Sequence, residues 1–395
     1  MSESGRAAVF VGTGKPFEMR EYPIPEPGPR DMVVRVCRAN ICGSDLHLWR
    51  GDTNLMSMGV TYGIVLGHEM TGEVVRMGAK VRGDSLGRPL KEGNRVVFSY
   101  YVPCDRCQAC IKGCSHMCIS SLMSPVRSCD MAPHFFGGFA DYYYVKSRQS
   151  VFKLPEGVDT AEAAGANCAL SQVLHGLEKA NLSFGETVVV QGAGGLGLFA
   201  CAVAKDMGAK KVIAIDGIPA RLELAKRFGA DETINIHEVA DGRARVARVM
   251  DLTGGWGGDV VVEVVGRPEV VNEGIRMVAR GGRYLEMGNI NPKHTYKADP
   301  SLLVGWNRSI IAVSLYPPDV LPRAIDFLER TRGRYPFDEL LSNDYSLEDI
   351  DQAFHEADAL SGSGSGITRA SIVPELSLSA AKPKDQQRDQ PQGVA

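Results

Sequence analysis

A glycine-rich turn between an apolar strand and a helix limits the fold of this chain more than any other feature. The apolar run Thr187–Gln191 predicts a strand, Gly-Ala-Gly-Gly-Leu-Gly follows it, and the pattern Leu196–Met207 predicts a helix. In such a turn Gly192 permits the tight bend, Gly194 lets the backbone approach a pyrophosphate, and Gly197 lets the helix pack closely on the strand. The bound anion then lies at the positive N-terminus of the helix. The sequence therefore predicts a dinucleotide site at Gly192, Gly194, Gly195, Leu196 and Gly197.

Strands and helices alternate after this turn. Further apolar strands are expected at Lys211–Asp216, Thr233–Ile236, Asp259–Val265, Arg283–Gly288 and Ser309–Leu315, and helices from Pro219, at Arg243–Leu252 and at Glu269–Ala279. Continuous apolar strands that alternate with helices are typical of a parallel sheet covered on both faces. The order of elements predicts an α/β protein with a doubly wound, Rossmann-type nucleotide domain.

Asp216 selects the kind of dinucleotide. It ends the second strand, 19 residues after Gly197. A carboxylate there accepts hydrogen bonds from the adenosine ribose and repels a 2′-phosphate, so the sequence favours NAD over NADP. Arg221 leaves use of NADP open, because a basic side chain tolerates a phosphate. The alternative reading is a glycine-rich packing site without a ligand, and strand, turn, helix and acid together disfavour it.

The part of the chain before residue 150 is expected to be β-rich, with short strands such as Met32–Val36, Gly72–Met77 and Arg95–Ser99. The long irregular stretch Cys104–Pro133 needs an internal cross-link to be ordered. Four thiols at metal-ligand spacing supply one: Cys104, Cys107, Cys110 and Cys118. Four thiolates close a tetrahedral Zn²⁺ site, which predicts a structural zinc. Cys114 is a substitute ligand, and an iron–sulfur cluster or free thiols are the alternatives.

Composition excludes several classes of partner. The formal net charge is −3 with no block of like charge, which argues against a nucleic-acid or anionic-membrane surface. The longest run without polar side chains, Gly192–Ala204, has 13 residues and is too short to span a bilayer. The N-terminus has no apolar core of a secretory signal, and clustered cysteines in a reducing compartment bind metal more often than they form disulfides. We expect a cytoplasmic protein.

A second set of metal-binding residues lies in Cys42-Gly43-Ser44-Asp45-Leu46-His47, followed by Gly67-His68-Glu69. Thiolate and neutral imidazole are good zinc ligands. These motifs, the four-cysteine segment and the glycine turn follow one another in an order that resembles the zinc-dependent alcohol dehydrogenases of the medium-chain dehydrogenase/reductase superfamily. The resemblance covers about residues 6–375 and is not specific for a substrate.

The resemblance implies a domain organisation. A GroES-like catalytic domain would cover residues 1–174, with a structural zinc lobe at 104–118, and a Rossmann NAD-binding domain would cover 175–312. A C-terminal part of the catalytic domain would cover 313–374. The polar segment 375–395 is expected to be a disordered tail. Relatives pair nucleotide domains through strands like Ser309–Leu315, which implies a homodimer or a homotetramer.

The resemblance also implies a catalytic zinc, so that two zinc ions are expected per chain. Cys42, His68 and Cys168 would hold it. Glu69 would lie behind the metal and be able to coordinate it, and Asp45 would orient His68 through the other ring nitrogen. Polyol dehydrogenase relatives place a glutamate near the position of Cys168, and this chain does not.

The implied reaction is hydride transfer between an alcohol and NAD. Ser44 would take the alcohol proton and pass it through the cofactor ribose to His47 and solvent. Arg369 stands where relatives carry an arginine near the pyrophosphate.

The substrate is expected to be a small alcohol or carbonyl compound. Trp49, Met123 and Phe135 suggest an apolar pocket wall and hence a secondary, bulky or cyclic alcohol. A polyol or sugar-alcohol dehydrogenase is the nearest alternative. A zinc-free reductase, a zinc hydrolase and a non-catalytic binding member of the fold are the others.

Overall fold

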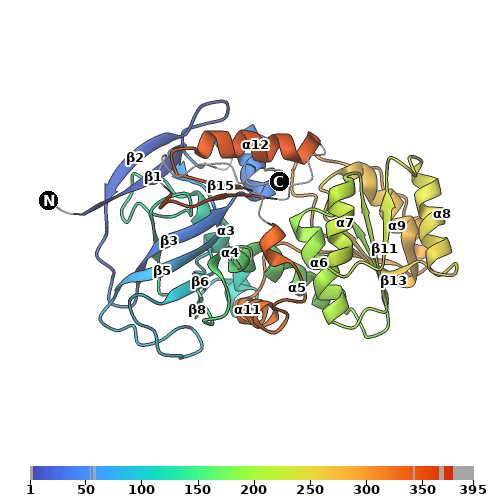
Figure 1. Cartoon of the computed structure of the whole chain (residues 1–395), viewed down its shortest axis with the longest axis horizontal. Helices are drawn as coiled ribbons and strands as arrows, with labels where there is room; N and C mark the ends of the chain where they lie inside the picture. Colours follow the sequence, from blue (N-terminus) through green and yellow to red (C-terminus); the bar gives the residue numbers. More distant parts are fainter. Residues whose placement is uncertain (1–2, 54, 57–58, 341–342, 364–368, 377–395) are drawn as a thin grey trace, which may run out of the picture.

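The computed structural model describes residues 3–53, 55–56, 59–340, 343–363 and 369–376, and two domains lie side by side in it (Figure 1). All but the first two residues of the predicted tail at 375–395 lie outside the described residues. Within the described part of the chain, every helix is too short or too polar to cross a bilayer.

The nucleotide domain contains a parallel sheet of six strands in the order β11-β10-β9-β12-β13-β14. The strands are β9 (Thr187–Gln191), β10 (Lys211–Asp216), β11 (Glu232–Asn235), β12 (Gly258–Glu263), β13 (Val278–Glu286) and β14 (Ser309–Ala312). The helices between them are α6 (Gly195–Asp206), α7 (Pro219–Arg227), α8 (Gly242–Leu252), η5 (Pro268–Val270), α9 (Val271–Met277) and α10 (Ser301–Val304). Order and direction confirm the predicted doubly wound fold.

The largest difference from the predicted boundaries lies around β13. The helix predicted to end at Ala279 ends at Met277, and the strand begins at Val278 rather than at Arg283. Val278 and Ala279 are apolar and suit a helix or a strand equally well. The pairing of Val278 with Gly258 on β12 decides, because it joins these residues to the parallel sheet.

The β-rich domain on the left of Figure 1 is built from two sheets. The first pairs β1 (Ser4–Phe10) with β2 (Glu18–Pro23) and β4 (Ile64–Val65). The second contains β15 (Asn343–Tyr345), β16 (Ala370–Ile372), β3 (Met32–Asn40), β5 (Glu69–Met77), β6 (Arg95–Phe98), β8 (Val151–Lys153) and β7 (Tyr142–Val145). Helices α1 (Gly43–Arg50) and α12 (Ile350–Ser363) belong to this domain. The pairing of Ser371 with Asn40 shows that the end of the chain completes a sheet begun near its start.

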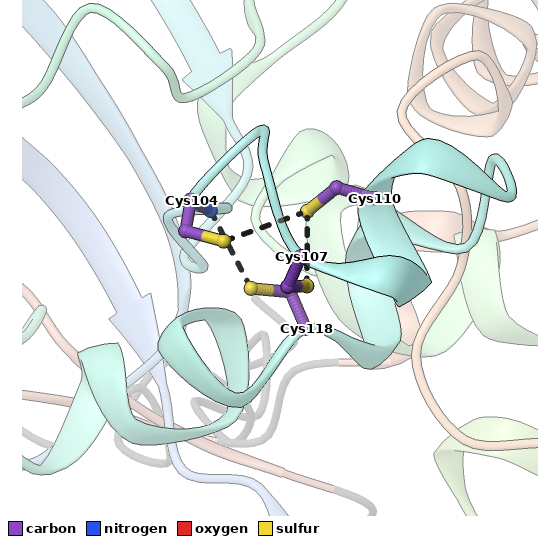
Figure 2. A group of neighbouring side chains, drawn as sticks. All are labelled: Cys104, Cys107, Cys110 and Cys118. Atoms are coloured by element: carbon purple, nitrogen blue, oxygen red, sulfur yellow. Dashed lines mark hydrogen bonds between the residues drawn. The ribbon is translucent and has the colours of Figure 1, made fainter.

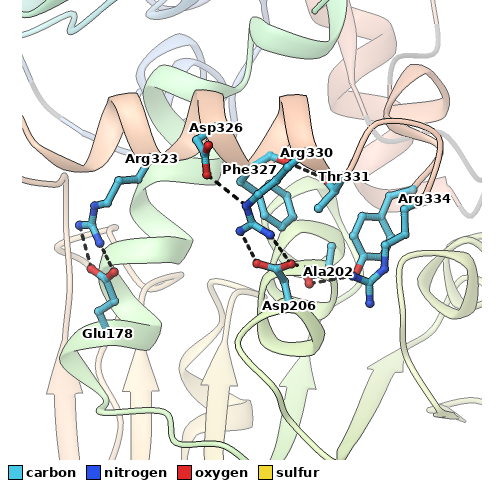
Figure 3. A network of polar contacts seen from close by, with 10 residues as sticks. Glu178, Ala202, Asp206, Arg323, Asp326, Phe327, Arg330, Thr331 and Arg334 are labelled. Carbon is cyan, nitrogen blue, oxygen red and sulfur yellow. Dashed lines mark hydrogen bonds and ion pairs between the residues drawn. The ribbon is translucent and has the colours of Figure 1, made fainter. Parts of the chain in front are cut away.

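The junction between the domains is helical. It comprises α4 (Thr160–Ala163), a π-helical turn η4 (Ala166–Leu170), α5 (Ser171–Lys179), α11 (Val320–Arg330) and η6 (Phe337–Leu340). The buried face of α11 joins the same core cluster as α5 and α6. Ion pairs reinforce this packing, since Arg323 contacts Glu178 on α5 and Arg330 donates to Asp206 on α6 at 2.6 Å (Figure 3).

The domain boundaries that the resemblance implies stay a prediction. The predicted C-terminal part of the catalytic domain begins at residue 313 and contacts both sides of the junction, since α11 packs on α5 and η4 and the Tyr101 hydroxyl of the β-rich domain donates to the Tyr316 carbonyl at 2.7 Å. Strands β15 and β16 then complete the sheet of the β-rich domain.

Candidate active site

Three distant segments bring together the predicted ligands of the catalytic zinc. Cys42 is the N-cap of α1, His68 and Glu69 lie at the start of β5, and Cys168 lies in the π-helical turn η4. One ligand atom from each of these four residues lies within 4.8 Å of all the others. Cys42, Glu69 and Cys168 are buried, and His68 is nearly so. Such π-helical turns occur often at functional sites.

Asp45 fixes two members of this cluster. Its carboxylate is buried and accepts hydrogen bonds from the backbone N–H of Cys42 at 2.9 Å and of Gly67 at 3.3 Å. The same carboxylate lies 3.3 Å from Nδ1 of His68. Burial lowers the pKa of His68, but the charges of Asp45 and Cys42 outweigh it and raise the pKa to about 10. Asp45 therefore lies where it can orient the imidazole, and Nε2 of His68 lies 3.3 Å from the Ser44 hydroxyl.

The two thiols of the cluster share a hydrogen bond. This bond lowers the pKa of Cys42 well below its usual range and raises that of Cys168. Two sulfurs, an imidazole and a carboxylate in one buried place are a donor set that zinc prefers, so the residues fit the metal. Because zinc binds thiolate and neutral imidazole, loading this site releases protons.

Arg369 connects the cluster to the nucleotide domain. It is buried, and its Nη1 contacts Oε2 of Glu69. The other oxygen of Glu69 is also buried and finds no hydrogen-bond donor among the described residues, which suits an atom that faces a metal. A Cβ atom on Gly195, the first residue of α6, would lie 2.3 Å from Nε of Arg369. The arginine predicted near the pyrophosphate therefore lies at the glycine turn and at the metal cluster at once.

The glycine turn has the backbone that the motif requires. Gly192 has φ +97°, and a Cβ atom on Gly197 would lie 1.8 Å from the Gly192 carbonyl oxygen, so a larger residue would force the turn apart. Asp216 accepts hydrogen bonds from the backbone N–H of Ala193 at 2.7 Å and of Ile218 at 2.9 Å. Arg221 lies in the first turn of α7, next in the chain. Both oxygens of Asp216 are thus fixed beside the turn and retain further acceptor capacity.

Four other cysteines form a separate centre in the segment after β6. This segment folds into the short helices α2 (Gln108–Ile111), η2 (Ser115–Met117), α3 (Ile119–Met123) and η3 (Ser124–Val126). The sulfurs of Cys104, Cys107, Cys110 and Cys118 point toward one another (Figure 2). Those of Cys107 and Cys110 are 3.6 Å apart, and those of Cys104 and Cys110 are 4.0 Å apart. Cys114 is exposed and lies outside this group, so Cys118 is the fourth member.

Comparison with known proteins agrees with both domains. Residues 28–156 match the family model of the alcohol dehydrogenase GroES-like domain, and residues 195–330 match that of zinc-binding dehydrogenases. The chain is 32% identical over 354 residues to the 5-exo-hydroxycamphor dehydrogenase of Pseudomonas putida, covering 88% of this chain and 94% of that one. It belongs to the zinc-dependent alcohol dehydrogenase family.

Two further proteins similar to this chain carry different names. D-xylulose reductase A of Aspergillus oryzae is 31% identical over 357 residues, 90% of this chain and 94% of that one. The crystal structure of an alcohol dehydrogenase from Thermotoga maritima superposes with a TM-score of 0.87 at 27% identity, covering 95% of this chain and all of that one. The protein is thus an oxidoreductase that uses zinc and a nicotinamide dinucleotide on a small alcohol or carbonyl compound.

His47 of the dehydrogenase lies on α1, one turn after Ser44. Its side chain is 20% exposed, and its Nδ1 lies 2.7 Å from a carboxylate oxygen of Asp52. The sequence analysis did not single out Asp52. A Gly-Asp pair directly after the helix was the only signal for it.

The structure also revealed Tyr100, which the sequence analysis missed. Its ring lies 4.8 Å from that of His68, measured between ring centres, and its hydroxyl bonds to Cys168. Burial raises the pKa of Tyr100 well above its usual range, so the hydroxyl remains a donor. Nothing in the local sequence distinguished this tyrosine from Tyr101 beside it.

The predicted apolar wall is wrong at two positions. Phe135 is fully buried in the β-rich core, where it packs against Tyr22 and Tyr142. Trp49 packs on Phe354 and His355 of α12, at the far end of α1 from Cys42. The sequence alone does not show whether an apolar side chain lines a pocket or packs in the core. Here Phe135 lies in the core of the β-rich domain and Trp49 packs against that core.

Proposed function

We propose that this dehydrogenase oxidises a secondary alcohol to a ketone with NAD⁺ and catalyses the reverse reduction. The observation that carries the proposal is the buried cluster of Cys42, His68 and Cys168 with the Ser44 hydroxyl at its edge. Arg369 links this cluster to the first residue of α6, where the pyrophosphate is expected. A metal centre and a cofactor turn joined by one side chain suit hydride transfer across the junction of the domains.

The chain's own residues have separate roles in this proposal. Cys42, His68 and Cys168 would hold the zinc, with Glu69 as an alternative ligand, and the zinc would supply a Lewis acid for the substrate oxygen. Ser44 would accept the alcohol proton, because its hydroxyl lies 3.3 Å from a ligand atom of the same centre. His47 would pass that proton to solvent. Burial of the cluster would keep water away from the reacting atoms.

Asp216 and the glycine turn supply the cofactor preference. Backbone N–H groups of Ala193 and Ile218 hold the carboxylate where the adenosine ribose would approach. A 2′-phosphate would meet this negative charge, which favours NAD. Arg221 lies close enough along the chain to permit some use of NADP.

Two relatives give two substrate classes to compare. The Pseudomonas relative is named for a hydroxycamphor, a cyclic secondary alcohol, whereas the Aspergillus relative is named for a sugar. We favour the first class, because Cys168 stands where polyol dehydrogenases carry a glutamate. The polyol class remains the second candidate.

The protein is further proposed to act in the cytoplasm as a homodimer or a homotetramer, without nucleic-acid or membrane partners. The support is the net charge of −3 and the position of β14 as an edge strand with outward side chains. A second copy of the chain would extend the sheet at this edge. The domain assignment is proposed as the resemblance implies it, with residues 1–174 and 313–374 forming the catalytic domain and residues 175–312 forming the NAD-binding domain.

One assay tests the proposal. Reduction of NAD⁺ and of NADP⁺ is followed with primary, secondary, cyclic and polyol alcohols, and metal content is measured on the same preparation. We expect two zinc ions per chain and the highest kcat/KM with a cyclic or bulky secondary alcohol and NAD⁺. Highest activity with a polyol would favour the second class, and absence of turnover with every alcohol would refute the proposed reaction.

A further inference from the structure

We propose that Asp52 positions His47, the last residue of the proposed proton path, for proton release. This inference rests on the proposed role of His47 and adds a residue outside the recognised motifs. Asp52 touches neither zinc ligands nor the glycine turn, so it acts through His47 alone.

The end of α1 places Asp52 against His47. Gly51 adopts the left-handed conformation with φ +78°, and a Cβ atom on it would lie 2.8 Å from Oγ1 of Thr13. The N–H of Gly51 donates to the Leu48 carbonyl at 3.1 Å, and the N–H of Asp52 donates to the His47 carbonyl at 2.9 Å. These two bonds form a Schellman motif, in which the second residue after the helix folds back over its last turn. Asp52 is therefore tied to His47 by a backbone bond and by a side-chain bond of 2.7 Å.

This contact sets the chemistry of the imidazole. An ionised carboxylate only accepts hydrogen bonds, so Nδ1 of His47 carries a proton and donates a hydrogen bond to Asp52. Nε2 is then the free acceptor, and it would be available to the proton that leaves Ser44. The proton leaves to solvent from a side chain that is 20% exposed.

Two other charged side chains at this corner contact groups other than the His47 ring. Arg50 of α1 contacts Asp358 of α12. Nζ of Lys293, from the loop after β13, donates to the Gly51 carbonyl at 3.4 Å. Lys293 thus ties the nucleotide domain to the same turn, which places His47 and Asp52 at the boundary between the domains. Asp52 is the carboxylate that faces the ring directly.

The test is the pH profile of kcat for alcohol oxidation in Asp52→Asn, His47→Gln and the double variant. We expect Asp52→Asn to lower kcat by on the order of 10-fold, as for other partners that orient a functional histidine. The pH profile of kcat should change as well, because Asp52 contacts the group that releases the proton. In the His47→Gln background the same change should have no further effect. Asp358→Asn, which removes a different carboxylate near α1, should leave the profile unchanged.

Two results would overturn the inference. One is an unchanged profile in Asp52→Asn, with any effect confined to the melting temperature, which would make Asp52 a helix-end residue only. The other is an additive effect of the two substitutions. A wild-type profile in His47→Gln would instead refute the proposed relay itself. Independently of activity, long-range ¹H–¹⁵N spectra assigned with His47→Gln should show the Nδ1-protonated ring, and the Nε2-protonated ring would contradict the inference.

Discussion

The two cysteine-containing centres of this dehydrogenase differ in how the chain builds them. Cys104, Cys107, Cys110 and Cys118 come from one segment of fifteen residues, and their sulfurs converge from a turn and short helices (Figure 2). The catalytic cluster draws Cys42, His68 and Cys168 from three segments that span more than a hundred residues.

The two centres also differ in burial and in the side chains around them. Three of the four lobe cysteines are only half-buried, and among the described residues the four sulfurs are the only ligand atoms in this group. The catalytic cluster is buried and surrounded by groups that can take part in chemistry, namely Asp45, Ser44 and Tyr100. A closed set of four thiolates leaves no position for a substrate, whereas three ligands and a carboxylate that can withdraw leave one. We therefore expect the zinc of the lobe to stabilise the fold and the zinc of the catalytic cluster to bind the substrate. Substitutions in each centre can test this division of roles.

The largest effect on activity is expected from Cys42→Ser. A hydroxyl is a poor zinc ligand, so the variant should contain one zinc per chain instead of two and show no turnover above background. Its melting temperature should change little, because the surrounding sheets do not depend on the metal. Metal analysis, initial rates and thermal unfolding measure these three quantities. Cys37→Ser is the matched control, and full activity with a single zinc in Cys42→Ser would contradict the division.

Cys104→Ser should give the opposite result. It opens the closed site, so the lobe should lose its zinc and become sensitive to proteases, with a loss of stability on the order of several kcal/mol. Activity should fall only as far as folded protein is lost. Cys114→Ser changes an exposed thiol of the same lobe and should alter neither zinc content nor stability. Equal loss of zinc in both variants would show that Cys114, and not Cys118 alone, serves the site.

Ser44→Ala should lower kcat less than loss of the catalytic zinc does. Without the hydroxyl the alcohol proton has no acceptor within the site, and a loss of about 10²–10⁴-fold in kcat is typical of a missing acid–base group. Both zinc ions should remain, and the dissociation constant for NAD⁺ should change little. Steady-state rates across the pH range and a cofactor titration check this. Near-wild-type turnover at neutral pH would mean that the proton passes directly to water.

Asp216→Ser should have the smallest effect and lies outside both metal centres. Repulsion between exposed like charges is worth about 1 kcal/mol, so the ratio of kcat/KM for NADP⁺ over NAD⁺ should rise by about 5-fold. The absolute rate with NAD⁺ should fall somewhat, because Asp216 also holds the N–H of Ala193 in the turn. Zinc content should be unchanged. A wild-type enzyme that prefers NADP⁺ would contradict the role given to Asp216.

The sequence determined the parts of this protein that are local. The glycine turn, the spacing of the lobe cysteines and strands such as β9 and β10 were predicted at the residues where they occur, because each depends on neighbours within one turn or one strand. The start of β13 was not, because Val278 takes its conformation from its partner on β12.

The tertiary structure decided which residues far apart in the sequence contact one another. It brought Arg369 between Glu69 and Gly195, placed Tyr100 against His68, folded Asp52 back onto His47, and removed Phe135 and Trp49 from the pocket wall. Motif positions predicted the ligands themselves, because metal chemistry restricts which residue types can bind. The partners of those ligands are ordinary residues, and only close packing, which fixes each side chain among neighbours far away in the chain, gives them a role.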